Sequence, residues 1–166
     1  MNFEPSLIKQ AEEILELAKV KNIKIATAES CTGGLISAIL TEIAGSSAVF
    51  ERGFVTYSNQ AKIDLLGVDA KTLEEFGAVS AGTAKEMAIG AVKNSLADLS
   101  VAVTGIAGPD GGTEDKPVGL VYVASFNRLN GKLICEECNF SKNRFQNRIL
   151  AVTKALHVLT TQLLNV

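Results

Sequence analysis

Three short segments of the sequence combine reactive side chains with residues that favour tight turns. Residues 29–34 read Glu-Ser-Cys-Thr-Gly-Gly, residues 57–62 begin with Tyr57 and end with Lys62, and residues 104–112 contain four glycines. Together they offer a nucleophile, groups that can accept its proton, and backbone N–H groups that can hold an anion. The chemistry that these groups favour is attack on a carbonyl carbon.

Ser30 is the first candidate nucleophile. It lies between an apolar run, residues 23–28, and Gly33 and Gly34, which precede a helical pattern. The first N–H groups of a helix have no partner within the helix, so a hydroxyl placed there lies beside donors that can hold an oxyanion. In the alternative interpretation, Ser30 or Thr32 only caps the helix and the glycines allow close packing.

The base for such a serine is not expected to be histidine. The single histidine, His157, falls within the long C-terminal helix, away from the strand ends. Lys62, Tyr57 or a carboxylate remain, and a partly desolvated Lys at the positive end of a helix loses its proton more easily. A Tyr hydroxyl can relay the proton or orient the serine. The alternative is a surface Lys and a half-buried Tyr without catalytic roles.

Cys31 is a rival nucleophile at the same helix start, ranked below Ser30 because no histidine accompanies it. Cys135 and Cys138 form a C-x-x-C pattern within a predicted strand, where residues three apart point to opposite faces. We therefore expect neither a redox nor a zinc site there, and three cysteines do not indicate a disulfide framework.

The glycine-rich segment 104–112 is not a standard nucleotide fingerprint. It lacks the Lys-Ser/Thr ending of a P-loop and the G-x-G-x-x-G spacing. Its consecutive N–H groups can form an anion-binding nest, although a flexible turn explains the glycines equally well. Arg144 and Arg148 lie four apart near a helix start, where they can clamp a phosphate with this loop or simply face solvent.

Composition excludes several classes of protein. Of the 166 residues, 47% are hydrophobic and 20% charged, which is typical of a globular domain. A net charge of −2 gives no basic surface for nucleic acid. The sequence contains no run of 18 uncharged apolar residues, and Glu4, Glu12 and Glu13 are unlike a signal peptide. We expect a soluble cytoplasmic protein that binds neither nucleic acid nor membrane.

The elements that position these residues alternate between strands and helices. Strands are predicted at residues 23–28, 53–57 and 99–104, and a hairpin at 118–126 and 132–140. Helices are predicted from Ser6, after Gly34, after the capping residues Ser58, Asp69 and Ser80, and over the C-terminal residues from Ile149. This order predicts one domain, residues 1–166, of the α/β class: a three-layer α/β/α sandwich with a mixed, mainly parallel central sheet. The three reactive segments then meet at the carboxyl ends of the parallel strands.

The sequence resembles the CinA C-terminal domain family, the nicotinamide-nucleotide amidohydrolases (PncC, or NMN deamidases). The resemblance covers nearly the whole chain and rests on ordered blocks: AESCTGG at 28–34, GSS at 45–47, FERGFVTYSN at 50–59, GAVS at 77–80, TGIAGPDGG at 104–112 and KPVG at 116–119. It implies hydrolysis of the carboxamide of nicotinamide mononucleotide to nicotinate mononucleotide and ammonia, without metal or cofactor. It further implies a homodimer.

The same resemblance implies roles for individual residues. Ser30 is the expected nucleophile, with Tyr57 and Lys62 activating it and the N–H groups around Cys31 to Gly33 holding the oxyanion. The expected substrate-binding residues are Cys31, Thr32, Gly33, Thr104, Gly105, Ala107, Gly108 and Arg144. In this assignment the glycine-rich loop and Arg144 bind the ribose phosphate.

Two alternatives stay open on the sequence. One is a non-catalytic, nucleotide-binding accessory protein linked to competence and DNA damage; the other is an amidase for a different phosphorylated or pyridine amide. A binding module does not need Ser30, Tyr57 and Lys62 together, so their joint presence favours an enzyme.

Overall fold

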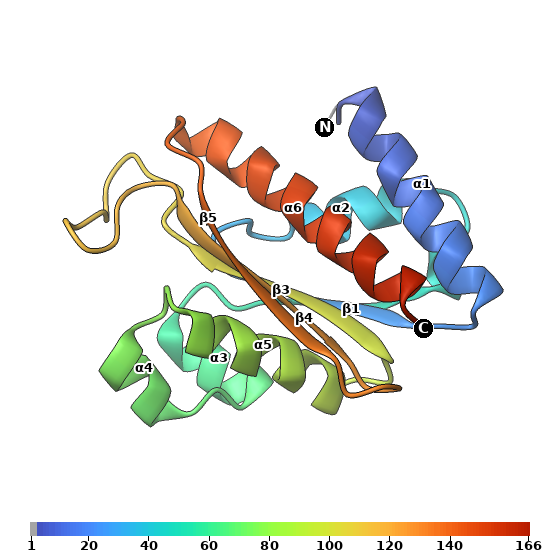
Figure 1. The fold of residues 1–166 in the computed structure, drawn as a ribbon, viewed down its shortest axis with the longest axis horizontal. Coiled ribbons are helices and arrows are strands. Elements are labelled where there is room, and N and C mark those ends of the chain that lie inside the picture. Colours follow the sequence, from blue (N-terminus) through green and yellow to red (C-terminus); the bar gives the residue numbers. More distant parts are fainter. Residues whose placement is uncertain (1–2) are drawn as a thin grey trace.

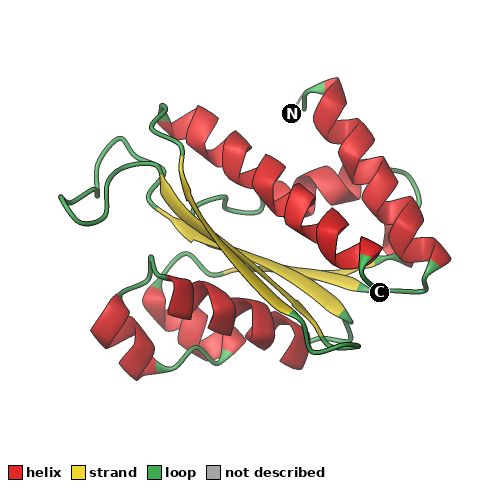
Figure 2. Cartoon of the chain, in the orientation of Figure 1, coloured by secondary structure: helices red, strands yellow, loops and turns green. Residues whose placement is uncertain are grey.

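The computed structural model describes residues 3–166 as one five-stranded sheet between two layers of helices (Figures 1 and 2). Helices α1, α2 and α6 cover one face of the sheet, and α3, α4 and α5 cover the other. This confirms the predicted α/β/α sandwich. The elements are α1 (Pro5–Val20), β1 (Ile25–Glu29), α2 (Leu35–Glu42), a 3₁₀ turn (Ser46–Ala48), β2 (Phe50–Val55), α3 (Asn59–Leu66), α4 (Ala70–Phe76), α5 (Ala81–Lys93), β3 (Leu99–Gly105), β4 (Leu120–Asn127), β5 (Leu133–Asn139) and α6 (Arg144–Leu164).

The strand order β2-β1-β3-β4-β5 brings three strand ends together. β1 pairs in parallel with β2 and with β3, while β4 runs antiparallel to both of its neighbours. β5 consequently has the direction of β3, and β4 is the one reversed strand within this sheet. Glu29 at the end of β1 lies opposite Val55 of β2 and Val103 of β3, so the segments that follow these strands leave from one edge.

Several predicted strand boundaries were wrong, most clearly the starts of the first two strands. The first strand begins at Ile25 rather than at residue 23, and the second begins at Phe50 rather than at Gly53. The start of the second strand was missed because its first residues include two charged side chains. Glu51 and Arg52 lie on the edge strand β2 and bind each other in an exposed ion pair. An edge strand tolerates such charges because one of its sides has no neighbouring strand.

The hydrophobic core is divided by the sheet into two clusters. The larger lies under α1, α2 and α6, and the smaller lies under α3, α4 and α5. The smaller cluster is rich in alanine, with Ala26 and Ala28 on β1 and Ala84, Ala88 and Ala91 on α5. These small side chains let α5 approach the sheet closely, which fixes the helices that follow β2.

Helix α3 packs directly on α5 through a glycine. A Cβ atom on Gly90 would lie 1.9 Å from the carbonyl oxygen of Leu66, the last residue of α3. The two backbones are therefore in contact, and α3 cannot move closer to α5 at this point. Across residues 3–166, no helix has the length and apolar character needed to cross a membrane.

Candidate active site

Ser30 occupies the sharp turn between β1 and α2. Its N–H donates to the carbonyl oxygen of Val103 at 3.0 Å, which extends the pairing of β1 with β3 by one residue. The chain then turns, and the N–H of Gly33 donates to the carbonyl oxygen of Ser30 at 3.0 Å. The half-buried Ser30 side chain is thus held at the end of a central strand, in the place expected for a ligand site.

Glu29, which sequence reasoning missed, supplies the acceptors for the start of α2. Its buried carboxylate accepts hydrogen bonds from the N–H groups of Gly34, Ile36 and Ser37 and from the Ser37 hydroxyl, at 2.8 to 3.1 Å. Residue Gly34 is the N-cap and has no capping side chain. The interpretation of Ser30 or Thr32 as the cap was therefore wrong. The available signal was an acidic residue within a buried strand that runs into a helix start.

The Ser30 hydroxyl contacts a buried amine. Nζ of Lys62, at the end of the first turn of α3, lies 3.0 Å from Oγ of Ser30 and 2.9 Å from the carbonyl oxygen of Thr56. Only 1% of Lys62 is exposed. The ion pairs found within residues 3–166 do not include Lys62, so no carboxylate compensates its charge. The surface position considered as an alternative was wrong.

Burial lowers the pKa of Lys62 below its ordinary value of 10.5, because removal of water penalises the ammonium form. The neighbouring Cys31 acts in the opposite direction and is the smaller effect. A neutral amine has a free lone pair, and the hydrogen bond to Thr56 fixes which way the nitrogen points. In its neutral form, Lys62 at this position is within reach of the Ser30 proton.

Cys31 is unsuited to act as the nucleophile. Burial raises the pKa of its thiol from 9.0 to about 11, and this outweighs the opposing effect of the nearby Arg148 charge. The thiolate, not the thiol, is the reactive form of cysteine. Of the two neighbouring candidates, the geometry favours the hydroxyl of Ser30.

The Tyr57 side chain is exposed and hydrogen-bonds to Arg144 rather than to Ser30. Its side chain is 62% exposed, and its hydroxyl accepts a hydrogen bond from Nη2 of Arg144 at 3.0 Å. Within the described chain, it forms no hydrogen bond with Ser30 or Lys62. Nη1 of Arg144 donates to the carbonyl oxygen of Gly108 at 2.8 Å. One guanidinium thus joins the segment after β2 to the glycine-rich loop.

The glycine-rich loop is held at several points rather than being a free turn. The Thr104 hydroxyl donates to the carbonyl oxygen of Ala78 at 2.7 Å, and the carbonyl oxygen of Ala107 accepts from Nδ2 of Asn147 at 3.0 Å. Gly105 is required by packing, since a Cβ there would lie 2.6 Å from Cγ2 of Val121. The exposed N–H groups of residues 110–112 donate no hydrogen bond within residues 3–166, so they remain able to bind an anion.

Arg148, one turn after Arg144 on α6, contacts a different segment. Nε donates to the carbonyl oxygen of Cys31 at 3.1 Å and Nη2 donates to that of Thr32 at 2.9 Å. The two arginines therefore do not clamp one ligand together, as considered from the sequence. The side chain of Asn143 caps α6. From the first turns of this helix, Arg148 binds the turn after β1 and Arg144 binds the glycine-rich loop, which fixes the two segments relative to each other.

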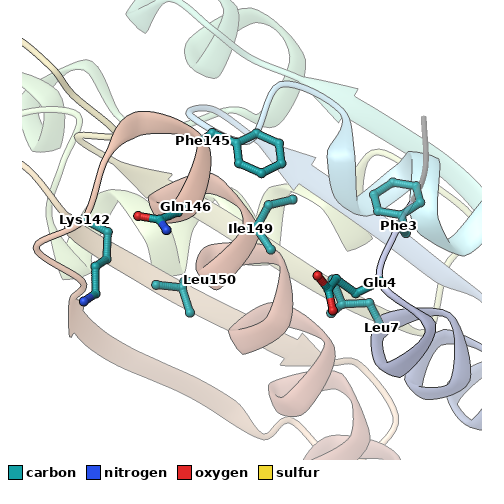
Figure 3. A pocket seen from close by; sticks show the side chains of 8 residues that line it. All are labelled: Phe3, Glu4, Leu7, Lys142, Phe145, Gln146, Ile149 and Leu150. Carbon is teal, nitrogen blue, oxygen red and sulfur yellow. The ribbon is translucent and has the colours of Figure 1, made fainter.

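The remaining sequence candidates lie elsewhere. His157 is exposed in the middle of α6. Cys135 packs on the α5 side of the sheet and Cys138 on the α6 side, as expected for residues three apart on a strand. A largely apolar hollow of about 460 Å³ lies between the first turns of α1 and α6, where Phe3, Leu7 and Phe145 line it (Figure 3). None of the candidate catalytic or substrate-binding residues lines this hollow.

Fold and site define an α/β sandwich with a serine–lysine pair at the end of its central parallel strands. The family model of the CinA C-terminal domain matches residues 7–163, and the chain belongs to this family. The nicotinamide-nucleotide amidohydrolase PncC of Escherichia coli K12 is 48% identical over 95% of this chain and 95% of its own length. The same values hold for the protein of that name from Shigella flexneri.

Other relatives have different names or lengths. A putative competence-damage inducible protein of Acetivibrio thermocellus is 52% identical over 93% of this chain but 38% of its own length, so the chain spans about two fifths of that relative. The crystal structure of the competence/damage inducible protein CihA from Agrobacterium tumefaciens matches with a TM-score of 0.95 and 49% identity. That match covers 97% of this chain and 98% of that one.

Proposed function

We propose that this protein hydrolyses the carboxamide of nicotinamide mononucleotide, giving nicotinate mononucleotide and ammonia, with Ser30 as the nucleophile. The observation that carries the proposal is the 3.0 Å contact between Oγ of Ser30 and Nζ of the buried Lys62. The two full-length relatives named nicotinamide-nucleotide amidohydrolase support the choice of substrate. A module that only bound nucleotides would gain nothing from burying an unpaired amine, which costs stability.

In the first step, the neutral amine of Lys62 takes the proton of the Ser30 hydroxyl while Oγ attacks the amide carbon. The carbonyl oxygen becomes an oxyanion in the tetrahedral intermediate. The hydrogen bond to Thr56 keeps Lys62 from rotating away during the transfer. General base catalysis of this kind contributes roughly 10²–10⁴ to the rate.

The oxyanion is held by the N–H groups of Cys31 and Thr32. The amides of Gly33 and Gly34 are engaged by the carbonyl oxygen of Ser30 and the carboxylate of Glu29. The amides of Cys31 and Thr32 donate to no other residue among those described, so the pair that directly follows the nucleophile is available to the oxyanion. Each such donor is typically worth roughly 10²–10³ in rate.

Collapse of the intermediate breaks the bond between carbon and nitrogen. The leaving nitrogen takes the proton from the Lys62 ammonium and departs as ammonia, which leaves an ester between Ser30 and the nicotinoyl group. Water then attacks the ester, with Lys62 again accepting a proton, and the acid is released while the serine hydroxyl is restored. The balance is one amide and one water to one acid and one ammonia.

The ribose phosphate is bound at the opening of the site. Arg144 carries the positive charge and is oriented by Tyr57 and by the carbonyl oxygen of Gly108. The free N–H groups of residues 110–112 provide further donors for phosphate oxygens. Tyr57 is thus assigned to substrate binding through Arg144, and Lys62 alone is assigned the proton transfer from Ser30.

The test is product analysis with the purified protein. Incubated with nicotinamide mononucleotide in EDTA, the wild type is expected to release ammonia and nicotinate mononucleotide in equal amounts, whereas free nicotinamide gives far less. Ser30→Ala is the matched control. Tight binding of the mononucleotide without ammonia release would favour the accessory-protein alternative, and efficient turnover of free nicotinamide would contradict the phosphate assignment.

A further inference from the structure

We infer that Arg148 is a positioning residue that orients the oxyanion-binding amide of Thr32 after Ser30, and this inference rests on the proposed function. Arg148 lies 116 or more positions from the residues it binds, yet it donates to two successive carbonyl oxygens of the turn, those of Cys31 and Thr32. It forms none of the ion pairs found within residues 3–166. The hydrogen bonds that it donates within these residues go to this backbone.

The peptide geometry links these carbonyls to the oxyanion site. In a trans peptide the C=O and the following N–H point in opposite directions. The bond from Arg148 to the Cys31 carbonyl therefore fixes the direction of the Thr32 N–H and turns it away from the arginine. The bond to the Thr32 carbonyl does the same for the Gly33 N–H, which donates to the carbonyl oxygen of Ser30.

Charge adds a second effect. A guanidinium on a carbonyl oxygen polarises the whole peptide unit, so the N–H at its other end becomes a stronger donor. The donor strengthened in this way is the free Thr32 amide. Preorganised donors of this kind stabilise the transition state more than the bound substrate, because the negative charge develops during the reaction.

The turn is shaped to admit the arginine. A Cβ atom on Gly33 would lie 3.5 Å from Nη2 of Arg148, an ordinary contact distance, so the guanidinium lies next to this part of the turn. Gly33 has a φ of +59°, a conformation that side chains disfavour. The positive φ of the turn therefore calls for glycine at this position, and the turn so formed presents its carbonyl oxygens to Arg148.

The experiment compares Arg148→Ala and Arg148→Lys with Arg144→Ala and with a control, Lys154→Ala, which removes only a surface ion pair with Glu136. Each is assayed on nicotinamide mononucleotide and on nicotinamide riboside, which lacks the phosphate, and its thermal midpoint is recorded. We expect Arg148→Ala to lower kcat about 100-fold, the effect of losing one oxyanion donor, with little change in KM. The loss should be the same on both substrates, and Arg148→Lys should recover part of it.

Three results would overturn the inference: unchanged kcat in Arg148→Ala, a defect in KM alone, or a defect that vanishes on the riboside. The last two would make Arg148 a phosphate ligand. A second assay separates failure of this inference from failure of the proposed function. In it, p-nitrophenyl acetate acetylates Ser30, and the mass of the intact protein reports the extent of acetylation. A wild type that is acetylated but inert to the mononucleotide refutes only the substrate, and slower acetylation in Arg148→Ala then supports the inference. Equal rates, or no acetylation of the wild type, contradict it.

Discussion

Nζ of Lys62 and Oγ of Ser30 lie 3.0 Å apart although 32 positions separate the two residues. The parallel pairing of β1 with β2 accounts for the contact, because Glu29 lies opposite Val55 and the segments that follow these two strands leave the sheet at the same edge. The hydroxyl of Ser58 accepts from the N–H of Ala61 and so starts α3 at a fixed place. The first turn of that helix, which Lys62 closes with a hydrogen bond to Ser58, then brings the Lys62 side chain back to the end of β1.

Activity should depend on pH through Lys62. The amine must be neutral to accept a proton, so kcat/KM is expected to fall as pH falls below the pKa of Lys62. Since burial lowers this pKa, the apparent value should lie below 10.5. Lys62→Met should lose about 10²–10⁴ in kcat, and its residual activity should lack this pH dependence. Initial rates from pH 6 to 10 check the profile, and a Lys62→Met enzyme with the wild-type rate would contradict it.

Cys31 should be dispensable for the chemistry and slow to react with thiol reagents. With a pKa of about 11, roughly 0.1% of the thiol is ionised at pH 8, compared with roughly 10% at the ordinary value. We expect Cys31→Ala to keep kcat within about threefold, because its backbone N–H remains and that group is the proposed donor. Iodoacetamide labelling followed by peptide mass mapping checks the reactivity. Loss of activity on selective alkylation of Cys31, together with an inactive Cys31→Ala variant, would make the thiol the nucleophile.

Tyr57 and Arg144 should behave as one unit. Arg144→Ala is expected to raise KM for nicotinamide mononucleotide about 10- to 100-fold, the value of a charge-assisted hydrogen bond of about 1.5–3 kcal/mol. Tyr57→Phe keeps the ring and should raise KM less, and the double variant should be no worse than Arg144→Ala alone. A kcat defect in Tyr57→Phe as large as that of Lys62→Met would instead assign Tyr57 to proton transfer.

Gly90→Ala should disturb the site from a distance. Alanine normally stabilises a helix relative to glycine by roughly 1 kcal/mol, but here its Cβ would meet the backbone of Leu66. We expect the free energy of unfolding to fall by about 2 kcal/mol, and kcat to fall because α3 must move with Lys62. Gly82→Ala is the matched control on the same helix, since its nearest neighbour is the Thr72 side chain at 3.3 Å. Urea denaturation measures the free energy of unfolding of both variants, and initial rates measure their kcat. A stabilised Gly90→Ala protein with full activity would refute the coupling.

Most of the fold was predictable because local signals agree with one another. Ser58, Asp69 and Ser80 each cap the helix that they were expected to start. The helices alternating with apolar runs, followed by a hairpin, led to the sandwich that the structure confirms. The family assignment is confirmed by the match over residues 7–163. The roles of Ser30, Lys62 and the substrate-binding residues stay predictions.

Contacts made by long side chains could not be read from the sequence. The acceptors of Arg148 lie in a turn at the other end of the chain, and the partner of Tyr57 is 87 positions away. Which partner a flexible side chain takes depends on where α6 lies across the sheet, and no local pattern encodes that placement. For the same reason, a carboxylate such as Glu29 reads equally as a catalytic or a capping group until α2 is positioned above it.

The central claim, that Ser30 activated by Lys62 attacks the amide, is tested most directly by trapping the ester. The protein is mixed with nicotinamide mononucleotide, quenched in acid within one turnover and examined by peptide mass spectrometry. We expect a nicotinate mononucleotide adduct on the peptide that contains Ser30, formed far more slowly in Lys62→Met and absent in Ser30→Ala. Turnover of the mononucleotide by Ser30→Ala at the wild-type rate, with no adduct in any variant, would contradict the claim.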